Sequence, residues 1–136
     1  MKAELLEDLK KILETVPTIT KVSHGKAEPL TSETNFNSIY IVPEISTFEN
    51  RTNKKGLSSY LEIFPVSLIV NTNNNNPLDY IQVERDIINY VLDDSKIWSK
   101  LFDREVSTIG YDRYDNFPKK EFIIQFEFKL IEPCKV

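Results

Sequence analysis

The sequence is poor in the residues on which most catalytic and cofactor sites depend. Its 136 residues include one histidine, one cysteine and three glycines. The glycines, Gly25, Gly56 and Gly110, are far apart, which excludes a phosphate-binding P-loop and a dinucleotide-binding fingerprint. A Ser-His-Asp triad would have to be built around His24, and no GxSxG elbow is present to carry its nucleophile. The single Cys134 excludes an intrachain disulfide and a zinc-binding cysteine cluster, so a reducing cytoplasm suits the chain.

Two further chemical readings of the sequence are weak. Asp112 and Asp115 in the stretch YDRYD offer two carboxylates to a hard cation, but such a cation takes about six oxygens, and a charged turn explains the pair more simply. Cys134 has no histidine near it in the sequence, which favours a passive thiol over a nucleophile. We therefore predict no catalytic residue, no metal site and no cofactor, and we expect that the protein is not an enzyme.

Charge and hydropathy argue against nucleic acid and membranes as partners. The formal net charge is −4, with an isoelectric point near 5.1, so the overall field repels a phosphate backbone. No apolar run approaches the length of a membrane span, and acidic residues interrupt the leucines of the N-terminus MKAELLEDLKK. The sequence predicts one soluble domain over residues 1–136, with no membrane contact.

Two segments have helical periodicity. In LLEDLKKILETV, apolar residues recur at spacings of three and four until Pro17, which predicts an amphipathic helix. The second helix is predicted to begin at Pro77, after the asparagine run 71–76. That run is interpreted as a joint rather than a ligand site, because asparagine tolerates turn conformations. The predicted apolar stripe of the second helix is Tyr80, Ile81, Ile87, Ile88, Val91 and Leu92.

Five segments are rich in β-formers: 18–24, 38–48, 57–70, 104–114 and 120–131. The second and third are predicted to pair as a hairpin, and so are the fourth and fifth. Pro43 and Pro65 cannot donate to a ladder and mark an edge, a bulge or a strand end.

The last strand has the clearest alternation in the chain. From Phe122 to Leu130 its even positions are apolar and its odd positions are mostly polar, so one face is predicted to meet the core. Adding the two helices gives an α+β fold in the order α-β-β-β-α-β-β, with a mainly antiparallel sheet of four to five strands covered on one face by both helices. The predicted core anchors are Phe122, Phe126, Phe128, Ile88 and Leu9.

The segment 57–70 is apolar at positions of both parities, which predicts cover on both faces of that strand. Two helices cover one face, and a second subunit is a natural cover for part of the other. The preceding tip, 49–56, holds Glu49, Arg51, Lys54 and Lys55, and is either a solvated tip or a docking element.

This order of elements resembles the tail terminator, or tail completion, proteins of long-tailed bacteriophages. The resemblance rests on the segments LLEDLKKILETV, SIYIVPEI, YLEIFPVSLIV, PLDYIQVERDIINYVL and EFIIQFEFKLI. It implies a structural protein that assembles as a ring, of six subunits, on the last ring of the tail tube. Such a ring stops tube growth and offers a surface to the head-tail connector protein.

The resemblance also implies where the protein acts and what it touches. Its partners would be further copies of itself, the tail tube protein and the connector, and DNA would pass through an acidic lumen without specific binding. The location would be the virion tail, reached from the host cytoplasm during assembly. By position, the docking surfaces correspond to the tip 49–56 and the polar loop 25–37.

Two alternatives remain open at this stage. The first is another head-tail joining or minor tail component, which would share the ring and differ in its partner. The second is a small α+β ligand-binding or enzyme domain with a pocket between the sheet and the loop 25–37. An enzyme should show a pocket in which polar groups converge, whereas a ring subunit should show complementary surfaces on two different faces.

Overall fold

The computed structural model describes residues 2–25, 37–52, 58–72, 77–93, 103–112 and 120–133. They form two helices and six strands. In chain order these are α1 (Lys2–Leu13), β1 (Ile19–His24), β2 (Asn37–Pro43), β3 (Thr47–Thr52), β4 (Ser58–Thr72), α2 (Pro77–Asp93), β5 (Asp103–Asp112) and β6 (Lys120–Pro133). The predicted α+β class, the mainly antiparallel sheet and the two helices are confirmed.

The strands lie side by side in the order β1-β2-β4-β6-β5, and β3 pairs with β4 beyond the end of β2. All pairs are antiparallel except β1 with β2, which run parallel. The predicted hairpins are confirmed, because the segment 38–48 pairs with β4 and β5 pairs with β6. The sheet has one strand more than predicted, since the segment 38–48 is divided between β2 and β3.

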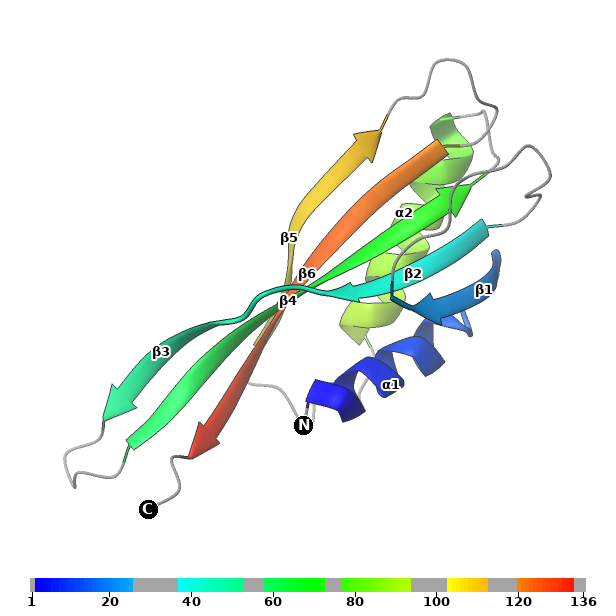
Figure 1. Ribbon diagram of the computed structural model, residues 1–136. Coiled ribbons are helices and arrows are strands. Elements are labelled where there is room, and N and C mark those ends of the chain that lie inside the picture. The colour runs from blue at the N-terminus through cyan, green and yellow to red at the C-terminus, as the bar shows by residue number, and fades with distance from the viewer. Residues whose placement is uncertain are drawn as a thin grey trace.

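Both helices pack against the same face of the sheet (Figure 1). The buried positions of α1 are Leu5, Leu9, Ile12 and Leu13, as its spacing predicts. From the sheet, the core takes the alternate residues of three strands. These are Ile39 and Ile41 of β2; Phe64, Val66, Leu68 and Val70 of β4; and Phe122, Ile124, Phe126, Phe128 and Leu130 of β6.

The helix α2 begins at Pro77 as predicted, but its buried stripe is rotated from the predicted one. Val83, Ile87 and Val91 are buried, while Ile88 is only partly buried against the core and Ile81 is 40% exposed. Residues four apart lie on one line of a helix, so the line through Val83, Ile87 and Val91 faces the sheet and Ile81 lies on its flank. The prediction of a buried Ile81 was therefore wrong.

The sheet continues beyond the helices as a narrow three-stranded extension, at the lower left of Figure 1. We call it the arm: it consists of β3 with the paired residues 58–61 of β4 and 131–133 of β6. The helices cover the other part of β4 and β6, which we call the body. The long strands β4 and β6 therefore pass through two different environments.

Pro65 sits inside β4, where a missing N–H would normally cost a ladder bond. In a strand, the N–H and C=O of one residue point to the same neighbouring strand. The Pro65 carbonyl accepts a hydrogen bond of 2.9 Å from the Glu44 N–H, so the nitrogen of Pro65 also faces that side. The pairing of β4 with β6 therefore loses no donor at Pro65.

Candidate interaction surfaces

A β-bulge separates β2 from β3 at the base of the arm. The contacts that flank it are the pair Pro43–Val66, the bond from Glu44 to Pro65, and the pair Thr47–Ile63. Ile45 and Ser46 therefore lie opposite the single residue Phe64, the two-against-one count of a bulge. A bulge redirects side chains that regular pairing would place on one face of the sheet.

The redirected residue is strongly apolar and fully presented to solvent. Ile45 is 90% exposed, and Glu44 beside it is also exposed. Three residues further on, Phe48 in β3 is 59% exposed. We call Glu44 and Ile45 the knob, because an exposed aliphatic side chain with a carboxylate next to it projects from the base of the arm.

Behind the knob lies an ion pair between a buried glutamate and a half-exposed lysine. Glu62 of β4 is 5% exposed, and one carboxylate oxygen lies 2.8 Å from the Lys2 ammonium at the start of α1. The same ammonium lies 4.9 Å from the ring centroid of Phe64, a cation–π distance. Burial alone would raise the pKa of the Glu62 carboxyl, but hydrogen bonding from Lys2 and Ser46 outweighs it and lowers the pKa. The first turn of α1 is thereby fixed to β4 opposite the bulge.

A second surface feature lies beside β1, the edge strand of the sheet next to β2. A hollow of about 310 Å³ opens between α1 and β1. It is lined by Lys10, Glu14, Ile19, Thr20, Lys21 and Val22. Ile19 and Val22 supply apolar surface, and the two lysines against one glutamate give its charged rim an excess of one positive charge. We call this feature the hollow.

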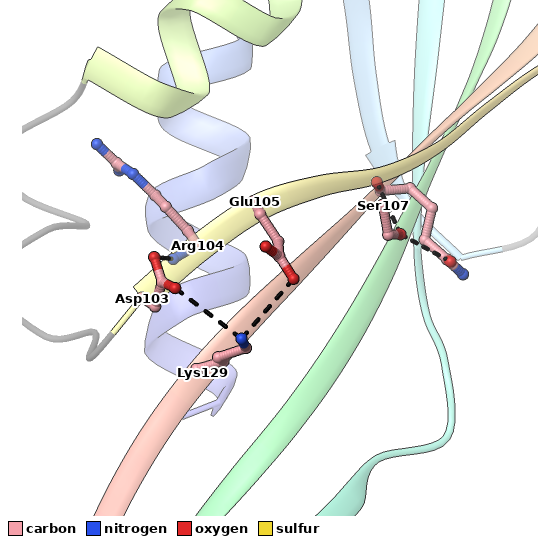
Figure 2. A network of polar contacts seen from close by, with 6 residues as sticks. Asp103, Arg104, Glu105, Ser107 and Lys129 are labelled. Carbon is pink, nitrogen blue, oxygen red and sulfur yellow. Dashed lines mark hydrogen bonds and ion pairs between the residues drawn. The ribbon is translucent and has the colours of Figure 1, made fainter.

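The opposite edge of the sheet, β5, is held to the molecule by polar contacts (Figure 2). The Lys129 ammonium of β6 reaches the carboxylates of Asp103 and Glu105 at 3.9 and 3.7 Å. Ser107 lies at an irregularity in the pairing and donates to the Gln125 side-chain oxygen at 3.0 Å. On the helix side, the buried Arg104 donates to the Leu92 carbonyl of α2.

Two glutamates face each other across this edge. Glu105 of β5 is paired with Glu127 of β6. Burial raises the pKa of the Glu127 carboxyl, and Glu105 raises it further through a hydrogen bond and like charge, against the lowering effect of Lys129. Glu84 on α2 also has a raised pKa, because of burial and in spite of Arg85. Glu84 and Glu127 lie on opposite sides of the sheet, so these two carboxylates do not form one site.

The residues predicted for docking are only partly within the described chain. Glu49 is exposed on β3, and Arg51 belongs to the same strand. Lys54 and Lys55 lie outside the described residues, as does most of the loop 25–37. The prediction that the tip 49–56 docks to a partner therefore stays a prediction.

The residues weighed for chemistry do not meet in the described structure. His24 lies 3.3 Å from Glu7 of α1, on the surface. Asp112 ends β5, and Asp115 and Cys134 lie outside the described residues. Within the described ranges, no three His, Cys, Asp or Glu side chains gather as a metal site, and neither helix is long and apolar enough to cross a membrane.

Four of the five predicted core anchors are fully buried, and the fifth, Ile88, is only partly buried against the core. Phe122, Phe126, Phe128 and Leu9 are at most 1% exposed, and the rings of Phe126 and Phe128 stack with their centroids 6.0 Å apart. Sequence reasoning missed the knob and the hollow. For the knob, the available signal was Pro43, since a proline in a strand can mark a bulge. Nothing in the sequence indicated that Ile45 would be the residue turned outward.

Comparisons with known proteins add little to this geometry. No protein-family model matches the sequence, and no curated protein matches it. Among solved structures, a chain from the "Virion of native gene transfer agent (GTA) particle" aligns over 96% of this chain and 91% of its own length. The sequence identity is 9% and the TM-score is 0.41, and at these values the likeness carries no argument about function.

Proposed function

We propose that this chain is a non-enzymatic structural protein of a phage-like virion. It assembles as a ring on the end of the tail tube, stops the polymerisation of the tube and offers the surface to which the head joins. The observation that carries this proposal is the presence of two unlike surfaces on one small domain, the acidic apolar knob and the basic hollow. Unlike surfaces at different places on a subunit suit head-to-tail assembly, which closes into a ring when the rotation between neighbours permits.

The distribution of polar groups also supports an assembly role over a catalytic one. The lining of the hollow includes no histidine or cysteine, and Glu84 and Glu127, whose pKa values are raised, lie on opposite sides of the sheet. A catalytic site needs such groups within hydrogen-bond reach of one reacting atom. The element order adds the resemblance to tail terminators, which supplies the tail tube and the connector as partners in this proposal.

The test is assembly of the purified protein, measured by native mass spectrometry and negative-stain electron microscopy. The protein is imaged alone and after addition to tail tubes purified from the phage or prophage that carries this chain. Closed rings, or rings at tube ends, are the expected result. A protein that stays monomeric and never decorates tube ends would contradict the proposal. Rings that bind the connector and ignore the tubes would instead favour the head-tail joining alternative.

The predicted docking segment 49–56 provides a more specific test of tube docking. Reversing Lys54 and Lys55 to glutamate should reduce the fraction of capped tubes without lowering the thermal stability, because charge reversal at a docking rim slows association. Lys11→Glu, an exposed reversal on α1, is the matched control. Tubes capped at the parental frequency by the Lys54→Glu, Lys55→Glu variant would remove the tip from the docking surface.

A further inference from the structure

We propose that the knob of one copy docks in the hollow of a second copy, with Ile45 against the apolar lining and Glu44 against Lys21. The contact joins successive copies head to tail. It rests on the proposed function and deepens it, because it names the surfaces through which one ring subunit would hold the next.

The first step is the unusual exposure of the knob. Ile45 is 90% exposed. In a continuous strand it would pair with β4, as the residues on both sides of the bulge do. The bulge that exposes it is backed by the Lys2–Glu62 ion pair. A large apolar side chain that is held outward by an anchored backbone is preorganised for contact, so docking requires little further ordering of the chain.

The second step is the fit of the hollow to an aliphatic side chain. The hollow is open and measures about 310 Å³; its accessible lining is mostly polar, and Ile19 and Val22 supply the smaller apolar part. An apolar cavity of about 150 Å³ already accommodates a benzene molecule, so a branched side chain and part of its backbone have room here. Burying Ile45 would remove from water the most exposed large apolar side chain of the described residues.

The third step is charge, which identifies a second copy as the occupant. Glu44 adjoins Ile45 and Glu49 follows four residues later, and both are exposed. The rim of the hollow carries Lys10 and Lys21 with a single opposing Glu14. An acidic knob and a net basic rim on the same chain are complementary between copies, and such rim charges fix the register of a contact.

The fourth step is distance, which prevents a chain from filling its own hollow. Val22 in the lining is paired with Ile39 of β2, and Ile45 lies six residues further along the chain. At the rise of an extended strand this is about 20 Å. The contact is therefore between different patches of two copies, and it generates a ring or a filament when each copy holds a new neighbour through its second patch.

The first experiment compares Ile45→Ser with the matched control Ile81→Ser by sedimentation velocity over a range of protein concentrations. Ile81 is also an exposed isoleucine, but it lies on α2 away from both surfaces. Ile45→Ser should weaken self-association by about tenfold or more, as the loss of one buried aliphatic side chain implies, whereas Ile81→Ser should not. Circular dichroism checks that both variants remain folded. Equal association of Ile45→Ser and the parent would overturn the assignment.

The second experiment swaps the charges. Glu44→Lys and Lys21→Glu should each weaken association, and the chain carrying both should recover most of it, because the reversed pair can form between neighbours. A double variant no better than the weaker single variant would overturn the Glu44–Lys21 contact.

The third experiment mixes two single variants. Ile45→Ser retains a hollow and Lys21→Glu retains a knob, so their mixture should form dimers and nothing larger. A mixture that forms no dimer, or that forms rings, would contradict a head-to-tail contact through these surfaces.

These results separate the inference from the proposed function. If the parent forms rings or caps tubes and Ile45→Ser does so equally well, the knob–hollow contact is contradicted and the proposed ring assembly is retained. If the parent forms neither rings nor capped tubes, both proposals fail.

Discussion

The body and the arm are built from the same two strands and differ in what covers them. In the body, alternate residues of β4 and β6 are buried beneath α1 and α2. The arm extends beyond the helix layer (Figure 1). Ile45 at its base and Phe48 in β3 are exposed. The comparison teaches that alternation along a strand predicts which face a residue is on, but the neighbouring layer decides whether that face is buried.

The two regions consequently serve different purposes. The body contains the contiguous apolar core, which supplies the free energy of folding. The base of the arm presents an apolar residue outward, and the Lys2–Glu62 ion pair lies behind it. In our proposal the body keeps the subunit folded while the bulge joins it to its neighbour.

The sharpest contrast between the regions is the effect of removing a phenylalanine ring. Phe126→Ala in the body should lower the free energy of unfolding by about 3–5 kcal/mol, because it leaves a cavity against the stacked Phe128. Phe48→Ala in the arm, where the ring is 59% exposed, should cost less than about 1.5 kcal/mol. Denaturant unfolding of both variants measures the difference. Similar losses would mean that the arm contributes to the core as much as the body does.

The contrast between the body and the arm also explains which parts of the fold could be predicted from the sequence. Strong periodicity placed α1, α2 and the core face of β6, because each of these patterns is produced by burial against one continuous layer. The sequence also placed a break near Pro43, since a proline cannot donate to a ladder. It did not predict that Ile45 turns outward, because an isoleucine in an apolar strand is normally assigned to a buried face.

The hollow escaped prediction for a different reason. Lys10 and Lys21 belong to separate elements, and only the packing of α1 beside β1 brings them together. The parallel pairing of β1 with β2 also depends on tertiary structure, since the residues of β1 are compatible with either direction. Local pattern therefore gives the elements and their buried faces, whereas surfaces shared between elements require the fold.

The ion pair at the base of the arm should have an intermediate effect. Lys2→Met removes the cation from the buried Glu62 and should lower the free energy of unfolding by about 1–2 kcal/mol, the cost of leaving a buried acceptor without its partner. Because the folded state lowers the pKa of Glu62, the stability from this pair is complete above the ordinary pKa of a glutamate. It is lost as the pH falls through the lowered pKa.

Unfolding measured at several pH values checks this behaviour. The difference between the parent and Lys2→Met should shrink in acid. Lys11→Met, on an exposed face of the same helix, is the control and should change stability little at any pH. A difference that stays constant from neutral to acid pH would show that Lys2 acts through packing alone.

The smallest expected effect belongs to the outer face of the β5 edge and has the opposite sign. Glu127→Gln should raise the free energy of unfolding by about 0.5 kcal/mol at neutral pH, because it removes a like-charge pair with Glu105 directly across the ladder. The raised pKa means that the folded state binds the Glu127 proton more tightly than the unfolded state does. The parent therefore loses stability as the pH rises through the interval from the ordinary to the raised pKa, and the gain from Glu127→Gln should disappear below that interval. Lys129→Met is the matched variant with the opposite expected effect. It should lower the free energy of unfolding at neutral pH, since Lys129 offsets the charges of Asp103 and Glu105. If Glu127→Gln instead lowers the free energy of unfolding at neutral pH, a favourable contact of Glu127 outweighs its repulsion by Glu105. The β5 edge would then be stabilised by a charged glutamate, as the base of the arm is by Glu62.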